Sequence, residues 1–297
     1  MKTRVLLIVG VLGICLSCEK YDEYIEDYEF SAVYFATQKP LRTIVAYDEM
    51  KFNVGVALGG KRSNAADEYA DFVTDPTLLE DETLLEGNDF ILMPEAYYSL
   101  SDESRMQVPK GEFIGDITVT LNREAFTSDE LSRENTYAIP LRITGTSTDS
   151  ILGGRDYTIL VVRYISRYDG TYYHKGIQTE TDQDGNVVED TIYSTRDLID
   201  HETWNVSTLG AATISTPGAG AFADGSLVLD VDESSNVVTI APGSENLEIT
   251  EQSGTYDSEK REFYLDYGFT RDSRTYRVSD TLVLRQPPEK DLYFEEW

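Results

Sequence analysis

Residues 115–121 read G-D-I-T-V-T-L, and residues 136–144 read T-Y-A-I-P-L-R-I-T. In both stretches apolar side chains alternate with polar ones, which is the period-two pattern of a β-strand with one buried face. Residues 157–165 are apolar on both faces, as expected of a strand in the centre of a sheet. Pro140 lacks a backbone N–H, which favours an edge or bulge position for its strand. Strands of this length and spacing predict a β-sandwich.

The same pattern continues toward the N-terminus and is interrupted once. Residues 31–36 and 51–58 alternate in the same way and predict two further strands. Residues 64–86 instead contain two pairs of leucines after Asp75-Pro76, which is a helix start signal. We therefore predict one or two short helices in this segment, crossing the end of a sheet.

The chain is almost wholly strand-like after Arg167-Tyr168-Asp169-Gly170, which we interpret as a hinge. Asp182-Gln183-Asp184-Gly185 is typical of a tight hairpin turn. Short strands joined by tight turns favour an up-and-down barrel or a meander sandwich. We expect these strands at residues 171–181, 186–194, 202–207, 211–215, 226–231, 237–241, 262–269 and 276–285, with a slip of register at Gly268. The predicted fold class is therefore all-β, a sandwich followed by an antiparallel barrel or meander domain.

The start of the chain has the pattern of an export signal. Lys2 and Arg4 precede an apolar run of about a dozen residues, which is the length of a signal-peptide core and too short to span a bilayer. Ser17 followed by Cys18 resembles the bacterial lipobox, in which the cysteine is acylated and becomes the first residue of the mature protein. One position departs from that pattern, since Cys15 occupies the place of the usual leucine. The alternative is an ordinary secretory signal with a chance cysteine.

An acidic run, E-K-Y-D-E-Y-I-E-D-Y at residues 19–28, follows Cys18. It cannot bury much surface, so it predicts a solvated tether. It also resembles the acidic export segments of surface-exposed lipoproteins of Bacteroidetes. We therefore divide the chain into a signal peptide at 1–17, an acidic tether at 18–29, a sandwich at 30–166 and a second β-domain at 167–297. The expected location is the outer membrane, with the protein held by its lipid alone and facing outward.

Composition excludes several classes of function. The chain has 25 Lys and Arg against 54 Asp and Glu, a formal net charge of −29. This charge argues against nucleic acid and against polyanionic glycans bound through broad electrostatics, so neutral ligands fit better. Both cysteines, Cys15 and Cys18, lie in the leader, which leaves the mature body without disulfide or thiol chemistry.

The sequence motifs give no support to catalysis or to a metal site. Asp182, Asp184 and Asn186 resemble the start of a calcium loop, but Tyr193 stands where the bidentate glutamate is required, so the hairpin interpretation is favoured. His201-Glu202 lacks the second histidine of a zinc-protease motif. We therefore expect a protein that is not an enzyme and needs no metal or cofactor.

Four stretches follow one another in the order of a known module: E-A-Y-Y-S-L at 95–100, V-P-K-G-E-F at 108–113, and the strands at 116–121 and 137–143. Together they resemble the N-terminal immunoglobulin-like domain shared by Bacteroidetes surface glycan-binding lipoproteins and some family 18 endoglycosidases. S-G-T-Y-D at 253–257 and the strands after it resemble the C-terminal β-domain that accompanies this module. No catalytic (β/α)₈ barrel fits, because it needs about 250 residues and about 130 remain.

The resemblance implies a non-catalytic lipoprotein that captures oligosaccharide for an outer-membrane transporter and a glycosidase. Aromatic rings stack on sugars, so the candidate binding residues are Trp204, Trp297, Tyr172, Tyr173 and Tyr193. For each of them, packing in the core is the alternative. The alternative function is an adhesion or structural subunit that binds another protein, for example through an exposed strand edge.

Overall fold

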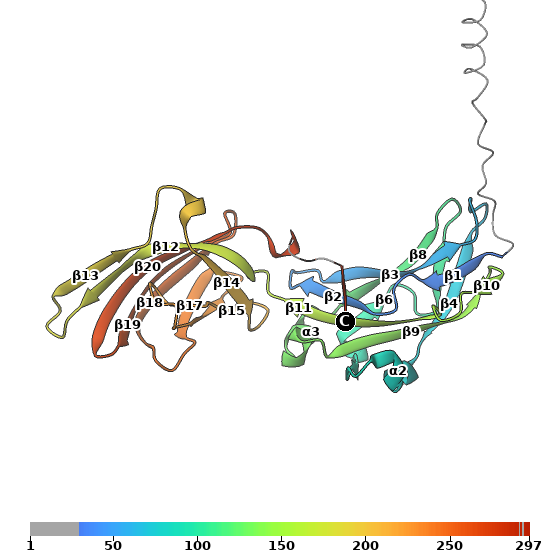
Figure 1. The fold of residues 1–297 in the computed structure, drawn as a ribbon, viewed down its shortest axis with the longest axis horizontal. Helices are drawn as coiled ribbons and strands as arrows, with labels where there is room; N and C mark the ends of the chain where they lie inside the picture. Colours follow the sequence, from blue (N-terminus) through green and yellow to red (C-terminus); the bar gives the residue numbers. More distant parts are fainter. Residues whose placement is uncertain (1–29, 291, 293) are drawn as a thin grey trace, which may run out of the picture.

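The chain folds into two β-domains that lie side by side along the long axis of the molecule (Figure 1). This computed structural model describes residues 30–290, 292 and 294–297. The predicted all-β class is confirmed. The signal peptide at 1–17, Cys18 and the acidic tether at 18–29 lie outside the described residues.

The first domain is a sandwich of two sheets. One sheet has the strand order β10 (Ser150–Ile151), β1 (Ala32–Phe35), β3 (Lys51–Gly59), β8 (Ile114–Leu121), β6 (Tyr98–Leu100). The other has the order β21 (Glu295–Glu296), β2 (Pro40–Val45), β11 (Tyr157–Ile165), β9 (Tyr137–Thr146), β4 (Glu68–Thr74), β7 (Arg105–Val108), with β5 (Ile91–Leu92) paired to β9.

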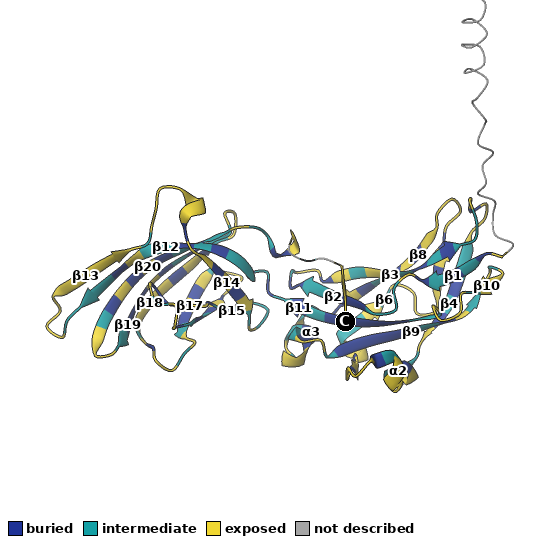
Figure 2. Ribbon diagram, viewed as in Figure 1, coloured by how far each residue is buried: buried dark blue, intermediate teal, exposed yellow. Residues whose placement is uncertain are grey.

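Alternation along the strands builds the core between these sheets. On β8, Ile117, Val119 and Leu121 are buried, and the residues between them face outward. β11 is buried at five consecutive positions, because one face meets the other sheet and the opposite face is covered by short helices. Figure 2 shows these buried stripes in both domains.

Short helices form in part of residues 64–86, as predicted, but they cover the outer face of β9 and β11 and do not cross the end of a sheet. Asp75 and Asp81 cap η1 (Pro76–Leu79) and α2 (Glu82–Leu85), and Leu78 and Leu85 pack there. The remaining short helices are η2 (Glu95–Tyr97), α3 (Arg123–Thr127), η3 (Glu130–Arg133), η4 (Leu198–Asp200) and η5 (Pro288–Lys290).

Two sequence predictions in this domain are wrong. Residues 68–74, read as part of the helical segment, form strand β4, whose Ala70 and Phe72 are buried. Pro140 does not mark an edge strand, since β9 lies between β11 and β4. The missing N–H is tolerated because Pro140 sits just beyond the last β4–β9 pair, Thr74–Leu141, where its carbonyl accepts from Asp75 N.

The second domain is an up-and-down antiparallel barrel, closed by pairing of its first and last strands, β12 and β20. Its register slips between β18 and β19, opposite Gly268, as predicted. The strands are β12 (Gly170–Thr181), β14 (Thr203–Thr208), β15 (Thr213–Ser215), β16 (Leu227–Val231), β17 (Val237–Pro242), β18 (Glu248–Asp257), β19 (Glu262–Arg271) and β20 (Arg274–Leu284).

A ninth strand, β13 (Val187–Ile192), forms a ribbon with the second half of β12 and projects from the barrel (Figure 1). The predicted hairpin turn joins them, and Asp182 Oδ1 accepts from the backbone N–H groups of Asp184 and Asn186. This carboxylate therefore organises the turn, in line with the hairpin interpretation of D-Q-D-G.

The C-terminal tail returns to the first domain, although our range 167–297 placed it in the second. β21 pairs with Pro40 and Leu41 of β2. Trp297 Nε1 donates to Ile159 O at 2.7 Å, and the indole meets the ring of Phe90 edge-on with centroids 4.7 Å apart.

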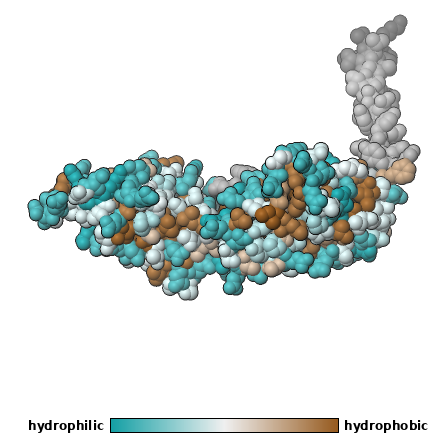
Figure 3. Space-filling model, turned by 90° about the horizontal axis from the view of Figure 1, so that it is seen from below, coloured by the Kyte–Doolittle hydropathy of each residue, from teal (hydrophilic) through white to brown (hydrophobic). Residues whose placement is uncertain are grey.

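Within the described part of the chain, none of the helices has the length and apolar character needed to cross a membrane. The face drawn in Figure 3 is mainly hydrophilic, with hydrophobic residues in separate patches over both domains.

Candidate functional site

A pocket of about 330 Å³ lies where the two domains meet. The first domain contributes Tyr47 from the loop after β2, and the predicted hinge contributes Arg167 and Tyr168. Two hairpin turns of the barrel supply the other lining residues: Glu233 and Asn236 between β16 and β17, and Tyr256, Ser258 and Arg261 around the turn between β18 and β19. Domain boundaries are common places for small-molecule sites.

The local sequence fixes the two turns. Asp232 and Asp257 each accept backbone N–H groups two and three positions ahead, which closes the turn. Each turn then ends in a left-handed residue, Asn236 and Arg261, both with φ of 58°. Asparagine tolerates this conformation, whereas arginine adopts it at a cost of about 1–2 kcal/mol. The strained residue lies in the pocket wall.

Polar contacts join the domains around the pocket. Arg123 Nη2 donates to both carboxylate oxygens of Glu233, at 2.8 and 2.9 Å. Arg167 Nη2 pairs with Asp48 at 3.1 Å. Below the pocket, Ser166 N donates to Thr208 Oγ1 and Ser166 Oγ donates to Ala211 O. Residues of both domains therefore line the pocket, and these contacts hold the two sides of the pocket together.

Three tyrosines give the pocket its aromatic character. The rings of Tyr168 and Tyr256 meet edge-on with centroids 4.8 Å apart, and Tyr47 faces them from the first domain. Burial raises the pKa of Tyr256 to about 12 and also raises the pKa of Tyr168 and Tyr47. All three phenols therefore stay protonated near neutral pH, and the Tyr47 hydroxyl donates to Glu289 and accepts from Arg261.

Two of the predicted aromatic residues are inside the barrel. Trp204 is 4% exposed and stacks on His174, with ring centroids 3.5 Å apart. Tyr172 is fully buried, and its hydroxyl donates to Tyr168 O at 2.8 Å. Burial removes both from the candidates for an exposed stacking platform and agrees with the core-packing alternative.

Tyr193 belongs to a buried polar cluster. Its hydroxyl donates to Asp280, which also accepts from the Tyr267 hydroxyl at 2.8 Å and lies 3.0 Å from His174 Nε2. Burial, with the nearby Asp280 carboxylate, raises the pKa of Tyr193. Tyr193 thus fastens the segment after β13 to the barrel.

The other two candidates lie elsewhere. Tyr173 is partly exposed on the outer face of β12, and Trp297 packs on the first domain. The five predicted residues are not brought together, and the pocket between the domains is lined by other residues. Among the residues that line this pocket, Arg167 and Tyr168 belong to the predicted hinge and Tyr256 to the S-G-T-Y-D motif, and no sequence signal indicated the others.

Two other hollows have fewer features of a binding site. One, about 400 Å³, lies on the outer wall of the barrel over Ser253, Asp266 and Ser279. The other, about 440 Å³, lies at the sandwich edge and combines Tyr98 with Glu95 and Glu103.

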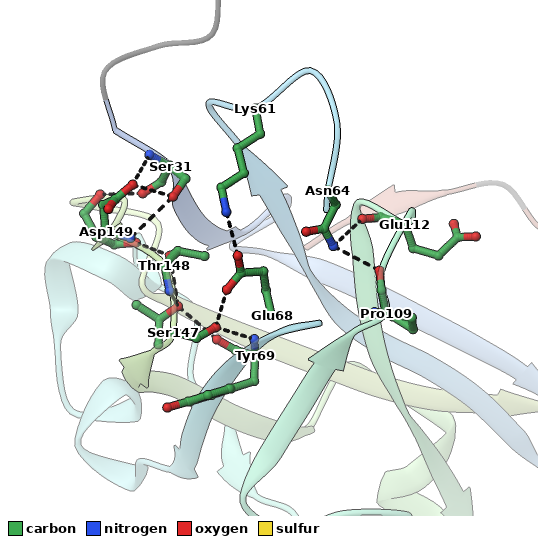
Figure 4. Close-up of polar contacts among 12 residues, drawn as sticks. Ser31, Lys61, Asn64, Glu68, Tyr69, Pro109, Glu112, Ser147, Thr148 and Asp149 are labelled. Carbon is green, nitrogen blue, oxygen red and sulfur yellow. Dashed lines mark hydrogen bonds and ion pairs between the residues drawn. The ribbon is translucent and has the colours of Figure 1, made fainter. Parts of the chain in front are cut away.

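A polar network surrounds the start of β1 (Figure 4). Ser31 N and Oγ donate to Asp149 at 2.8 and 2.6 Å, and Lys61 pairs with Glu68 at 2.6 Å. Asn64 Nδ2 donates to two carbonyls, while its Oδ1 is buried without a hydrogen-bond partner. These contacts tie loops together where the described chain begins, so we assign them a structural role.

Two family models match the chain in succession. Residues 26–150 match a model described as an N-terminal domain, and residues 157–283 match one described as a C-terminal domain. The chain belongs to this two-domain family. No curated protein matches the chain.

Three solved structures from Bacteroides are similar to this chain, and the one with the highest TM-score among them shares its fold. A Bacteroides ovatus protein of unknown function is 23% identical with a TM-score of 0.75, and the match covers 91% of this chain and 99% of that one. A second B. ovatus protein of unknown function is 14% identical with a TM-score of 0.46, covering 91% and 100%. EndoBT-3987 of Bacteroides thetaiotamicron, solved with a Man5GlcNAc product, is 22% identical with a TM-score of 0.33, covering 44% of this chain and 31% of its own.

Proposed function

We propose that this protein is a non-catalytic surface lipoprotein that binds oligosaccharide in the pocket between its two domains. It captures the sugar for uptake by an outer-membrane transporter or for cleavage by a glycosidase. The observation that carries the proposal is the pocket lining, in which three tyrosines meet polar side chains at a domain boundary.

This lining suits the chemistry of a sugar. A pyranose ring presents C–H groups that pack on aromatic faces, and its hydroxyls need both donors and acceptors. The Asn236 amide and the guanidinium groups of Arg167 and Arg261 donate, while Glu233 and Ser258 offer acceptors. A reaction would need an activated nucleophile or an acid–base pair, and the lining residues offer neither in a recognisable arrangement.

The binding test uses the soluble body, residues 19–297, on an array of plant, host and microbial glycans, with calorimetry on every hit. Asn236→Gly removes the amide but keeps the left-handed turn, because glycine adopts positive φ freely. We expect this variant to bind about tenfold more weakly at an unchanged melting temperature.

Ser273→Gly is the matched control, since it makes the same kind of change at φ of 64° in the turn between β19 and β20. It should bind like the unmodified protein. Equal loss in both variants, or no glycan bound at all, would contradict the proposal.

One observation favours the second candidate function, a subunit that binds another protein. All six residues of β13 are exposed, including Val187, Val188 and Ile192, and in the described sheet β13 has a neighbour on one side only. An unpaired edge can accept a strand from a partner. Such a protein would ignore free oligosaccharides, and placing proline at Ile192, whose N–H points away from β12, would abolish its partner binding.

A further inference from the structure

We propose that the pocket between the domains selects a sugar unit carrying one acidic group, a carboxylate or a sulfate, held between Arg167 and Arg261. This inference rests on the proposed function, since it names the class of glycan that the same pocket takes.

The pocket lining is positively charged, although the chain as a whole carries −29. Its charged residues are Arg167, Arg261 and Glu233. Glu233 already has both oxygens engaged by Arg123, which is not a lining residue. Within the lining, Glu233 is therefore shared between Arg123 and Arg167, which it approaches to 3.8 Å, and it is the lining's one acidic residue for two arginines.

The carboxylates that do pair with these arginines lie toward solvent. Asp48, beside Arg167, is 90% exposed, and Glu289, 3.9 Å from Arg261, is 42% exposed. The arginine side chains are less exposed, at 26% and 32%. Water and salt screen exposed ion pairs strongly, so these two carboxylates compensate the buried part of the arginine charge poorly.

Arg167 and Arg261 both contact the side chain of Tyr47. Arg261 Nη2 donates to the Tyr47 hydroxyl at 2.9 Å, and the Arg167 guanidinium lies 5.1 Å from the centre of the Tyr47 ring. Two like charges held this close in a partly desolvated pocket repel each other. An anion bound between the two guanidinium groups would attract both of them and offset their mutual repulsion.

Arg167 also has unused hydrogen-bonding capacity. Its Nε is buried without a hydrogen-bond partner, and the nearest carboxylate oxygen, from Glu233, is 3.8 Å away. A guanidinium binds planar or tetrahedral oxyanions with two parallel hydrogen bonds, which a neutral hydroxyl cannot match. A small rotation of Arg167 toward a bound acidic group would satisfy this donor.

The overall charge limits the ligand to one acidic unit at this position. The surrounding acidic surface repels a polyanionic chain, whereas a mostly neutral oligosaccharide can place a single acidic group inside the pocket. Tyr47, the lining tyrosine that is partly exposed, would then contact the ring of that sugar unit.

Calorimetry on matched glycans tests the inference, using the soluble body and sets that share one core, such as lactose, 3′-sialyllactose and 3′-sulfolactose. For glycans that the array identifies, the neutral member and its carboxylated and sulfated forms are compared. We expect an acidic form to bind about tenfold tighter than the neutral one at about 0.05 M salt, with the gap narrowing at about 0.5 M. The carboxylate and sulfate arms show which group is preferred.

Arg261→Gln and Arg167→Gln should each reduce the ratio of acidic-form to neutral-form affinity to about twofold or less. Arg277→Gln is the control, since Arg277 pairs with Glu251 on the outer wall of the barrel and is 71% exposed. Neutral and acidic members bound equally, before and after substitution, would overturn the acidic-sugar inference and leave glycan binding intact. Absence of binding to every glycan would overturn both.

Discussion

Asp280 is the residue on which the polar interior of the barrel depends. It is 2% exposed and accepts from Tyr193 and Tyr267 beside His174. Asp280→Ala leaves these donors buried without an acceptor, so we expect a loss of about 2–4 kcal/mol in the free energy of unfolding, measured with urea. Asp266→Ala, on the exposed side of β19, should change it little. Similar losses for both variants would contradict the role given to Asp280.

Buried tyrosines make stability sensitive to alkali. Burial raises the pKa of Tyr256 to about 12, and the pKa values of Tyr172 and Tyr267 are also raised, against an ordinary value of 10.0. The fold therefore favours the protonated phenols, and this stabilisation is complete below pH 10 and is lost as pH rises through the folded pKa values. We expect some of the 20 tyrosines to ionise near pH 10 and the rest only with loss of β-structure, followed by absorbance and circular dichroism. Complete ionisation of all tyrosines near pH 10 with intact β-structure would contradict this.

Trp204 does not fit the predicted role of an exposed stacking residue, because it is buried. Trp204 stands between two polar residues, Thr203 and Asn205. On a strand, however, neighbours point to opposite faces, so polar neighbours place Trp204 and Val206 together inside the barrel. The alternation of polar and apolar residues at 203–206 therefore indicates that Trp204 is buried.

At the scale of elements, β12 shows how closely strands approach around the polar cluster. A Cβ added to Gly176 would collide with Ser279 O and Asp280 Oδ1 on β20. Gly176→Ala should therefore lower the free energy of unfolding by about 1–3 kcal/mol. Gly153→Ala is the matched control, because nothing lies within 4 Å of its added Cβ. The measurement is the melting temperature of each variant. Equal melting temperatures would contradict the expected destabilisation by Gly176→Ala.

Most elements were predictable because the period-two pattern is strong, as in β8 and β20. β4 was missed although four of its seven residues, E-Y-A-D-F-V-T, are common in strands, because it was assigned to the same segment as the helix start signal at Asp75-Pro76. The pocket between the domains could not be predicted, since its two turns and the Tyr47 loop are far apart in sequence and converge only in the fold.

At the scale of the whole molecule, the described chain begins at the end of the first domain that is farthest from the barrel (Figure 1). A lipid on Cys18 would therefore leave the barrel pointing away from the membrane. We expect a palmitate analogue to label the unmodified protein and not Cys18→Ala, and protease added to whole cells to cleave it. Equal labelling of both would contradict the anchor.

The return of the tail has a consequence for synthesis. Glu295 and Glu296 pair with Leu41 and Pro40, nearly the whole chain earlier, and Trp297 packs on Phe90. The ribosome synthesises these residues after the segments that they contact, so until they emerge the edge of β2 is unpaired and Phe90 lacks its partner ring. Proteases and chaperones act on surfaces of this kind. The first domain therefore completes its second sheet only after the strands of the barrel have been synthesised.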